Sequence, residues 1–273
     1  MSGIVGPLVL VGGGKMGSAL LAGWLRAGLA AGDAWVVEPD PEKRSALAAE
    51  HGVHVTAHPG GIVGMTTPRT LVVAVKPQML DAAIPAYRAC MAPSTLVLSI
   101  AAGKAIATFE AAFGAATPVV RAMPNTPAAV GRGATVLCAN AHVDAAKRAE
   151  AEALMAAVGD TAWVEDEELM HAVTAMSGGG PAYVFLLIEA LAAAGARLGL
   201  PDDMAMRLAR ATVIGSGELA QQNPAPASQL RIDVTSPGGT TRAALDVLMG
   251  EQGLQPLVDA ALAAAARRSR ELA

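Results

Sequence analysis

The sequence is poor in charged residues, aromatic residues and cysteines. Of its 273 residues, 16% are charged, 3% are aromatic and 53% are hydrophobic. The core is therefore expected to consist mainly of Ala, Val, Leu and Met side chains. Soluble domains usually carry about 25% charged residues. We therefore expect part of the surface to be covered, most simply by another copy of the chain.

Neither the cysteines nor the charge indicates a metal, redox or nucleic-acid function. Cys90 and Cys138 lie in apolar runs without metal or redox spacing, which favours buried thiols in a reducing compartment. A net charge of −4 gives no electrostatic reason to expect nucleic acid or an anionic membrane as a partner. The helical segments carry no carboxylate–histidine ligand pattern, so no metal site is predicted.

Hydrophobic runs long enough for a membrane are also lacking. The N-terminal residues have no basic start of a signal peptide. The longest apolar stretch, 181–196, contains Glu189 and is too short to cross a bilayer. We therefore expect a soluble, cytoplasmic protein.

The first 165 residues alternate between short apolar runs and segments of helix length. Most of the runs are continuously apolar and β-branched, as in strands covered on both faces. The alternation predicts an α/β fold with a Rossmann-type, doubly wound parallel sheet over residues 1–165. The expected strands are 7–12, 34–38, 53–56, 70–75, 95–100, 118–123, 134–139 and 161–165, and the expected helices are 15–30, 41–51, 78–90, 104–113 and 143–158.

After residue 165 the strand-like runs stop. Residues 166–273 are predicted to form an all-helical dimerisation and substrate-binding domain. Its helix near 181–199 is apolar almost all round and is expected to be buried, plausibly between subunits. The other expected helices are 166–176, 202–222, 226–232, 238–250 and 253–271.

A glycine-rich loop follows the first strand. Gly12, Gly14 and Gly17 have the G-x-G-x-x-G spacing, which suits a tight turn, backbone contact with a pyrophosphate and close helix packing. A tight turn without a ligand is the alternative. Its place at the first strand–helix junction favours a dinucleotide site, with Gly13, Lys15 and Met16 as the other loop residues.

The second strand ends at Glu38, about 20 residues after the loop, where an acidic residue usually accepts hydrogen bonds from the adenosine ribose. This carboxylate would repel a 2′-phosphate. Lys43 and Arg44 follow and could reach such a phosphate, although a solvated helix face is the simpler interpretation. The site leans towards NADH without excluding NADPH.

Two later strand ends also adjoin loops of small residues. In such sheets, ligands bind beyond the carboxyl ends of the strands. The candidates are Ala74, Val75, Lys76 and Pro77 after one strand, and Ala101 and Ala102 after the next. Asn125, between two prolines, is a further candidate, with ordinary turn chemistry as the alternative.

The segment "DVTSPGGTTRAAL" (233–245) interrupts an Ala- and Leu-rich region. Ser236 is a suitable N-cap and Pro237 a suitable first helical residue. Glycines after them would leave backbone N–H groups bare for a carboxylate. The candidate contacts here are Gly238, Gly239, Thr240 and Thr241.

A second glycine-rich helix start is expected at Ser177–Pro181. Two unusual caps without a ligand are the alternative, but their pairing with a dinucleotide fold favours a small anionic substrate. No Ser–His–Asp order or reactive cysteine stands out, and His171 has no obvious partner. Cofactor chemistry is therefore predicted.

Together these motifs resemble the pyrroline-5-carboxylate reductase family. The matching pieces run in order along nearly the whole chain: "GGGKMG", "AVKPQ", "IAAG", "RAMPNTPAAVGRGAT", "AVTAMSGGGPAYVF" and "VTSPGGTTRAAL". The resemblance implies a Rossmann domain, an interlocking helical domain, an active site at a dimer interface, and dimers that often form decamers.

The resemblance also implies an activity and residue roles. A reduced nicotinamide, NADPH or NADH, would transfer hydride to the C=N carbon of pyrroline-5-carboxylate and give proline, the last step of proline synthesis. The substrate carboxylate would lie on Gly239 and Thr240, and Thr241 would hydrogen-bond the ring nitrogen as the catalytic residue. Glu167 and Asp233 would lie near the pocket.

Two departures from the family pattern matter. Gly179 replaces the middle serine of the usual Ser-Gly-Ser-Gly-Pro, so its role is absent or taken by Ser177. Glu38 stands where NADPH-using members often have a small hydroxyl residue, and Pro59 where some have a polar residue for the 2′-phosphate.

Three other functions stay open. The substrate could be a related cyclic imine of different ring size. A β-hydroxyacid-type dehydrogenase would need a Lys and an Asn on the helix after residue 180, which has neither. A non-catalytic scaffold would be expected to have lost a glycine loop.

Overall fold

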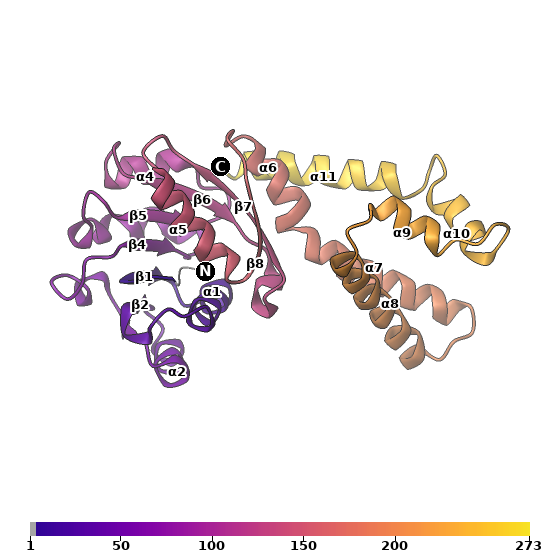
Figure 1. Cartoon of the computed structure of the whole chain (residues 1–273), viewed down its shortest axis with the longest axis horizontal. Coiled ribbons are helices and arrows are strands. Elements are labelled where there is room, and N and C mark those ends of the chain that lie inside the picture. Colours follow the sequence, from indigo (N-terminus) through magenta and orange to yellow (C-terminus); the bar gives the residue numbers. More distant parts are fainter. Residues whose placement is uncertain (1–3) are drawn as a thin grey trace. The chain divides into compact units, whose positions relative to one another are not determined.

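The computed structural model describes residues 4–273, which form two compact units. One unit comprises the residues up to Gly178 together with 266–273, and the other comprises 179–265 (Figure 1). The sequence predicts a domain boundary after residue 165, just past the last strand. In the structure the following helix, residues 169–173, belongs to the same unit as the sheet. The functional boundaries 1–165 and 166–273 stay a prediction.

The first unit is built on an eight-stranded sheet. The strand order is β3-β2-β1-β4-β5-β6-β7-β8, so β3 and β8 are the edge strands. Each predicted strand is present within two residues of its expected ends. The strands are β1 (Leu8–Val11), β2 (Ala34–Val37), β3 (His54–Thr56), β4 (Thr70–Val73), β5 (Leu96–Ser99), β6 (Val119–Met123), β7 (Gly133–Ala139) and β8 (Gly159–Trp163).

One pair of strands departs from the predicted parallel arrangement. β7 runs antiparallel to β6, with Arg121 opposite Cys138, and the other strand pairs within residues 4–273 are parallel. The connection, residues 124–132, holds only the 3₁₀-helix η4 (Thr126–Val130). A parallel crossover needs a dozen or more residues, so this short connection reverses the chain.

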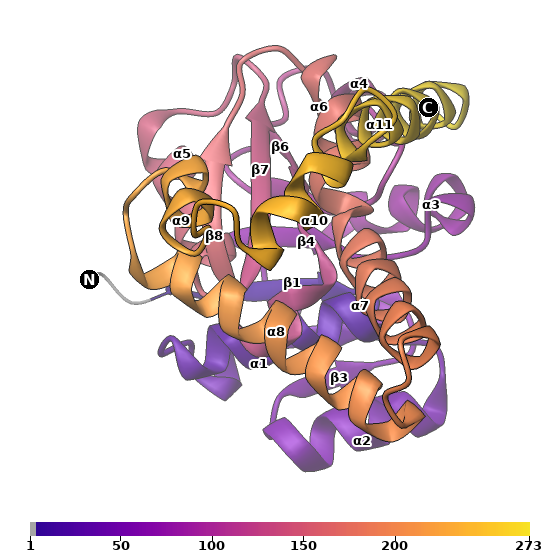
Figure 2. The ribbon, with the colours of Figure 1, turned by 90° about the vertical axis from the view of Figure 1, so that its right-hand side faces the viewer.

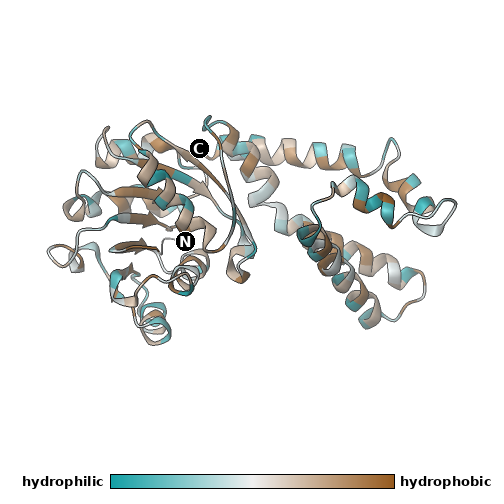
Figure 3. Ribbon diagram, in the orientation of Figure 1, coloured by the Kyte–Doolittle hydropathy of each residue, from teal (hydrophilic) through white to brown (hydrophobic). Residues whose placement is uncertain are grey.

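Helices cover both faces of the sheet, which confirms the predicted doubly wound fold. The hydrophobic strands are brown in Figure 3. Side chains of α1 (Lys15–Arg26), α2 (Pro41–His51) and α5 (Ala145–Ala156) form one core with them. Side chains of α3 (Pro77–Ala83), α4 (Ile106–Phe113) and the 3₁₀-helix η3 (Ile84–Cys90) form the core of the other face. The predicted helix 78–90 is thus α3 continued by η3. Shorter 3₁₀-helices are η1 (Ala31–Asp33) and η2 (Pro59–Gly61).

The limits of α2 follow from its capping residues. Asp40 accepts hydrogen bonds from the backbone N–H groups of Glu42 and Lys43, and Pro41 is the first helical residue. Gly52 ends the helix in the left-handed conformation with φ 66°. These are the side-chain N-cap and glycine C-cap that stop a helix at both ends.

The second glycine-rich segment does not start a new helix, contrary to the prediction. α6 (Leu169–Val173) continues through a π-helical turn, Thr174–Gly178, and after Gly179 into α7 (Gly180–Arg197). The Thr174 hydroxyl donates to the Met170 carbonyl at 2.7 Å within this run. Ser177 therefore lies inside a nearly continuous helix and caps no bare N-terminus.

The second unit is helical, as predicted. α7 and α8 (Asp202–Gln222) lie side by side (Figures 1 and 2). α9 (Ala227–Asp233) and α10 (Thr240–Leu248) follow, and α11 (Leu254–Glu271) ends in the first unit.

The apolar helix α7 is not buried within the single chain. Phe185 and Leu186 are 59% and 63% exposed, and Tyr183, Val184, Leu187 and Leu191 are also exposed. The single chain does not bury this helix, and its expected burial between subunits stays a prediction. An exposed apolar face of this extent marks an interaction surface.

One helical run in residues 4–273 is long and apolar enough to cross a membrane. It is Leu169–Arg197, with a mean hydropathy of 1.4. The π-helical turn lengthens this run beyond the apolar stretch judged too short from the sequence.

Candidate active site

The glycine loop between β1 and α1 has the geometry of a dinucleotide site. Gly12 has φ +97°, and a Cβ there would lie 3.0 Å from the Ala74 carbonyl oxygen. A Cβ on Gly17 would overlap the carbonyl oxygen of Gly12. Gly14 is the N-cap of α1, no side chain caps it, and its Cβ position faces open space. The first and last glycines are thus required by the fold, whereas Gly14 leaves room for a ligand.

Glu38 lies against this loop, not free in solvent. Its Oε2 accepts the backbone N–H of Gly13 at 2.8 Å, and its Oε1 accepts that of Asp40 at 3.0 Å. The residue is 7% exposed. The carboxylate therefore lies beside the phosphate-binding segment, where the adenosine ribose of a bound dinucleotide is expected.

The two nearby cations have partners of their own. Arg44 Nη1 donates to the carbonyl oxygens of Glu38 and Pro39 at 2.9 and 3.0 Å. Lys43 pairs with Asp40 at 3.5 Å on the exposed side of α2. Lys15 and Met16 open α1, directly after the loop.

The segments that follow β4 and β5 line a common cavity. Ala74 donates to the Val11 carbonyl at 2.8 Å, which keeps the first segment next to the glycine loop. Ala101 is buried, and its N–H donates to the Ser99 hydroxyl at 3.2 Å. A cavity of about 280 Å³ is lined by Pro77, Gln78, Ala102, Gly103, Lys104, Thr174, Ser269 and Leu272. Val75 and Lys76 come just before Pro77 in the chain, and Lys76 is the N-cap of α3.

The Asn125 side chain is engaged within the first unit. Its Oδ1 accepts the N–H of Ala134 at 2.9 Å. Its Nδ2 donates to the carbonyl and hydroxyl oxygens of Ser177 at 3.3 and 3.4 Å. Asn125 thus joins the start of β7 to the π-helical turn. The two predicted site residues, Asn125 and Ser177, are therefore in contact.

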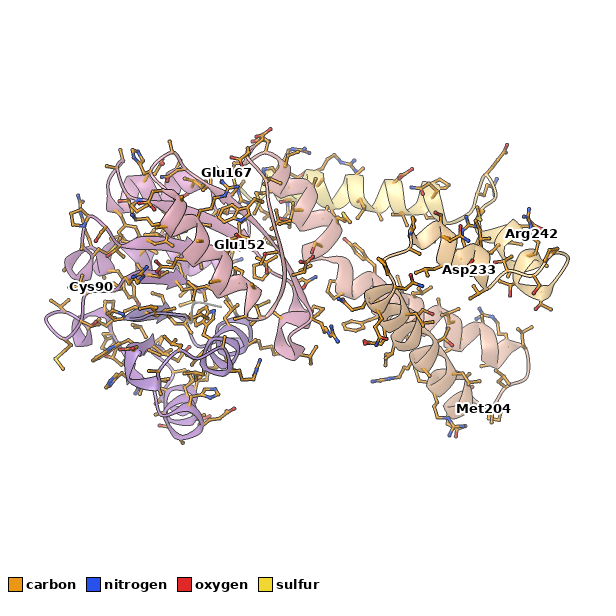
Figure 4. The ribbon with its side chains drawn as sticks, viewed as in Figure 1. Cys90, Glu152, Glu167, Met204, Asp233 and Arg242 are labelled. Atoms are coloured by element: carbon orange, nitrogen blue, oxygen red, sulfur yellow. The ribbon has the colours of Figure 1, made fainter. Side chains whose placement is uncertain are left out.

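Glu167 holds two other elements. Its Oε1 accepts the backbone N–H of Ile106, the first residue of α4, and Arg121 Nη1, both at 2.9 Å. Figure 4 marks Glu167 just before α6. It fastens the segment after Ala102 to β6, a role that its sequence position alone does not reveal.

The turn before α10 differs in detail from the prediction. The carbonyl of Ser236 accepts the N–H of Gly239 at 3.1 Å, and Gly238 has φ +68°. Proline followed by a residue of positive φ is the pattern of a type II turn. Ser236 is therefore not the N-cap. Gly238 is needed for the turn, and the helix begins later, at Thr240.

The N-terminus of α10 is nevertheless bare, as the motif suggests. Its N-cap is Gly239, and no side chain caps it. Thr240 and Thr241 are exposed first-turn residues, whose N–H groups have no acceptor within the helix. Asp233, the last residue of α9, accepts from Gln229 at 2.7 Å (Figure 4).

Comparison with known proteins gives the family. Residues 167–272 match the pyrroline-5-carboxylate reductase dimerisation model, and 7–103 match a model described as NADP oxidoreductase coenzyme F420-dependent. A pyrroline-5-carboxylate reductase of Pseudomonas aeruginosa is 40% identical, over 97% of this chain and 96% of that protein. The chain belongs to the pyrroline-5-carboxylate reductase family.

Solved structures of this family have the same fold. The pyrroline-5-carboxylate reductase of Coxiella burnetii superposes with a TM-score of 0.92 at 36% identity and covers 98% of both chains. That of Plasmodium falciparum, solved with NADP bound, has a TM-score of 0.83 at 28% identity and covers 99% of both chains.

Two features of this family member were not found from the sequence. His171 Nδ1 and the Ser269 hydroxyl are 2.9 Å apart, and both residues are buried. The partner of His171 is therefore near the end of the chain. Arg121 is 3% exposed within an apolar strand. A lone charge in "VVRAM" is the signal that could have indicated a buried ion pair.

The residues present fit a nicotinamide dinucleotide. The open space at Gly14 admits a pyrophosphate, the α1 N-terminus carries free N–H groups for it, and Glu38 offers acceptors for a ribose. NAD(P)H is the cofactor of this family member.

Proposed function

We propose that this chain reduces L-1-pyrroline-5-carboxylate to L-proline with NAD(P)H, the final step of proline biosynthesis. The observation that carries the proposal is the bare N-terminus of α10 in a chain with an intact dinucleotide loop. Similarity to pyrroline-5-carboxylate reductases over 97% of the chain supports it. The cofactor, when bound, supplies the hydride for the C=N carbon.

The glycine loop and the strand ends hold the cofactor. The N–H groups at Gly14, Lys15 and Met16 bind the pyrophosphate, and Gly17 lets α1 approach β1. The segment from Ala74 to Pro77, with Ala101 and Ala102, surrounds the nicotinamide half. The shared cavity of about 280 Å³ supports this role.

The start of α10 holds the substrate. A carboxylate suits the helix start at Gly239 and Thr240, where the N–H groups of Thr240 and Thr241 have no acceptor within the helix and the helix dipole is positive. The Thr241 hydroxyl hydrogen-bonds the ring nitrogen and orients the imine. Because a protonated cyclic imine already accepts hydride readily, Thr241 improves the geometry without being indispensable.

Several candidates act by positioning these groups. Glu167 ties the start of α4 to Arg121, and Asn125 ties Ser177 to β7. Asp233 and Ser236 shape the segment before the substrate-binding turn. Their hydrogen bonds support a role in keeping the pocket in shape.

The chain acts as a homodimer in which the helical domain of the second subunit covers the exposed apolar face of α7. Assembly of dimers into a decamer is the larger form that the family resemblance implies. The proposed location is the cytoplasm, with no membrane or nucleic-acid partner.

The test is steady-state oxidation of NADH and of NADPH by the purified protein with pyrroline-5-carboxylate. We expect kcat/KM in the range of ordinary enzymes, roughly 10⁴ M⁻¹s⁻¹ or more, with at least one cofactor. Absence of turnover in a folded, dimeric protein would overturn the proposal. Cyclic imines of other ring size in the same assay would then show whether a related imine is the substrate.

A further inference from the structure

The carboxylate of Glu38 is fixed where a dinucleotide cofactor distinguishes its two forms. It is 7% exposed and bonded to the backbone N–H groups of Gly13 and Asp40. NADH and NADPH differ only in the phosphate on the adenosine 2′-oxygen. In a fold of this type, the residue at the end of β2 faces that oxygen.

A carboxylate treats the two cofactors differently. Each of its oxygens has about two acceptor sites, so Glu38 can accept from ribose hydroxyls while keeping both backbone bonds. A 2′-phosphate offers no such donor and brings two negative charges against a shielded carboxylate. Like charges placed together at a binding site are a strong source of discrimination.

Glu38 cannot easily turn away from an incoming phosphate. Both carboxylate oxygens are held by main-chain donors, one of which belongs to the glycine loop itself. Moving the side chain would leave the N–H groups of Gly13 and Asp40 without their acceptors. A buried donor left unsatisfied is unfavourable, so the side chain remains in place.

The neighbouring cations do not offset this charge. The Arg44 guanidinium is bonded to the carbonyls of Glu38 and Pro39, at the base of the same turn. Lys43 is paired with Asp40 and is more than half exposed. Pro59 offers no side-chain hydrogen bond to a phosphate.

We propose that Glu38 makes this enzyme selective for NADH over NADPH, as a carboxylate locked in position by the backbone of Gly13 and Asp40. The inference rests on the proposed function in that it takes the glycine loop as the cofactor site. It goes further by assigning the cofactor and the residue that selects it.

Equilibrium binding tests this proposal independently of turnover. The Kd of NADH and of NADPH is measured with the full-length protein in the absence of imine, by quenching of protein fluorescence and by calorimetry. Adenosine 5′-monophosphate and adenosine 2′,5′-bisphosphate probe the adenosine half alone. We expect NADH to bind about 10-fold or more tightly than NADPH, with the same order for the two fragments.

Two substitutions assign the preference to Glu38. In Glu38→Ser the ratio of the two Kd values should fall at least 10-fold, mainly through tighter NADPH binding. Glu38→Gln, which keeps the size and one acceptor oxygen, should shift the ratio in the same direction and serves if the serine variant does not fold. The control Glu42→Gln removes an exposed carboxylate from the same turn and should leave the ratio unchanged.

Equal or tighter binding of NADPH by the unmodified protein would overturn the inference, as would an unchanged ratio in both Glu38 variants. These outcomes are separate from the fate of the proposed function. A protein that binds NADH selectively but does not reduce pyrroline-5-carboxylate would keep the inference and lose the activity. A protein that reduces pyrroline-5-carboxylate but prefers NADPH would keep the activity and lose the inference.

Discussion

The guanidinium of Arg121 and the carboxylate of Glu167 form a 2.9 Å ion pair, in which the Arg121 side chain is 4% exposed. Breaking a fully buried pair by removing one partner costs about 3–5 kcal/mol. Because the Glu167 side chain is 31% exposed, the expected loss is smaller. We expect Glu167→Ala to lower the free energy of unfolding by about 2 kcal/mol in urea titrations.

A neighbouring carboxylate provides the control for this change. Glu168 is exposed, so Glu168→Ala should change stability by less than about 0.5 kcal/mol. Equal urea midpoints for the two variants would show that the Arg121–Glu167 pair contributes nothing.

Two glycines of the same loop should respond differently to alanine. Gly14→Ala has room for its Cβ, so the fold should lose less than about 1 kcal/mol while NAD(P)H binds at least 10-fold more weakly. Gly17→Ala places its Cβ on the Gly12 carbonyl and should lower the thermal midpoint itself. Thermal unfolding and cofactor titration of both variants measure this contrast. Unweakened binding by Gly14→Ala would argue against pyrophosphate contact at Gly14.

Removing the Thr241 hydroxyl should slow the enzyme without stopping it. One hydrogen bond contributes about 1 kcal/mol, so kcat/KM of Thr241→Ala is expected to fall about 5-fold. Ser228→Ala, which removes an exposed hydroxyl from α9, is the matched control and should retain normal kinetics. Complete loss of activity in a folded Thr241→Ala protein would mean that this hydroxyl is an essential proton donor.

A charge on the exposed face of α7 should disrupt self-association. Phe185 is 59% exposed in the single chain, and its burial between subunits would be reversed by Phe185→Glu. Sedimentation equilibrium should show a shift towards monomer, whereas Ala49→Glu on the exposed side of α2 should leave the oligomer intact. An unchanged mass for Phe185→Glu would move the dimer interface elsewhere.

The two thiols should be unreactive in the native protein and should make stability fall in alkali. Burial raises the pKa of Cys90, and burial followed by the charge of Glu167 raises the pKa of Cys138, both above the usual 9.0. The unfolded chain then releases these protons first, so stability is full below about pH 9 and declines as the pH rises towards the folded pKa. A disulfide-exchange reagent at pH 8 should react slowly with native protein and rapidly in denaturant. Fast reaction in the native state would contradict the burial.

Local signals in the sequence predicted most helix and strand positions. α2 and α8 match their predicted ranges because Asp40, Gly52, Pro201 and Asn223 mark their ends. The direction of β7 was missed because local pattern does not encode strand direction. The length of the connection 124–132 was the available clue.

Backbone conformation at glycine was the second source of error. Because of the type II turn at Gly238, α10 begins at Thr240 and not at the predicted residue 238. The π-helical turn joins α6 to α7, where a break was predicted. Glycine permits both a break and a continuation, so flanking contacts decide. The partners of Glu167, Asn125 and His171 are distant in sequence, and no local pattern reveals them.

The two edges of the sheet have a consequence for how copies of this chain can meet. An exposed strand edge is a template for adding strands from another molecule, and long flat edges aggregate. Here β3 has only three residues, and β8 carries the exposed Asp160 and is followed by Glu165 and Asp166. Short length at one edge and negative charge at the other discourage strand addition. Growth of the sheet into fibres is thereby disfavoured, so copies of the chain are expected to associate through their helices.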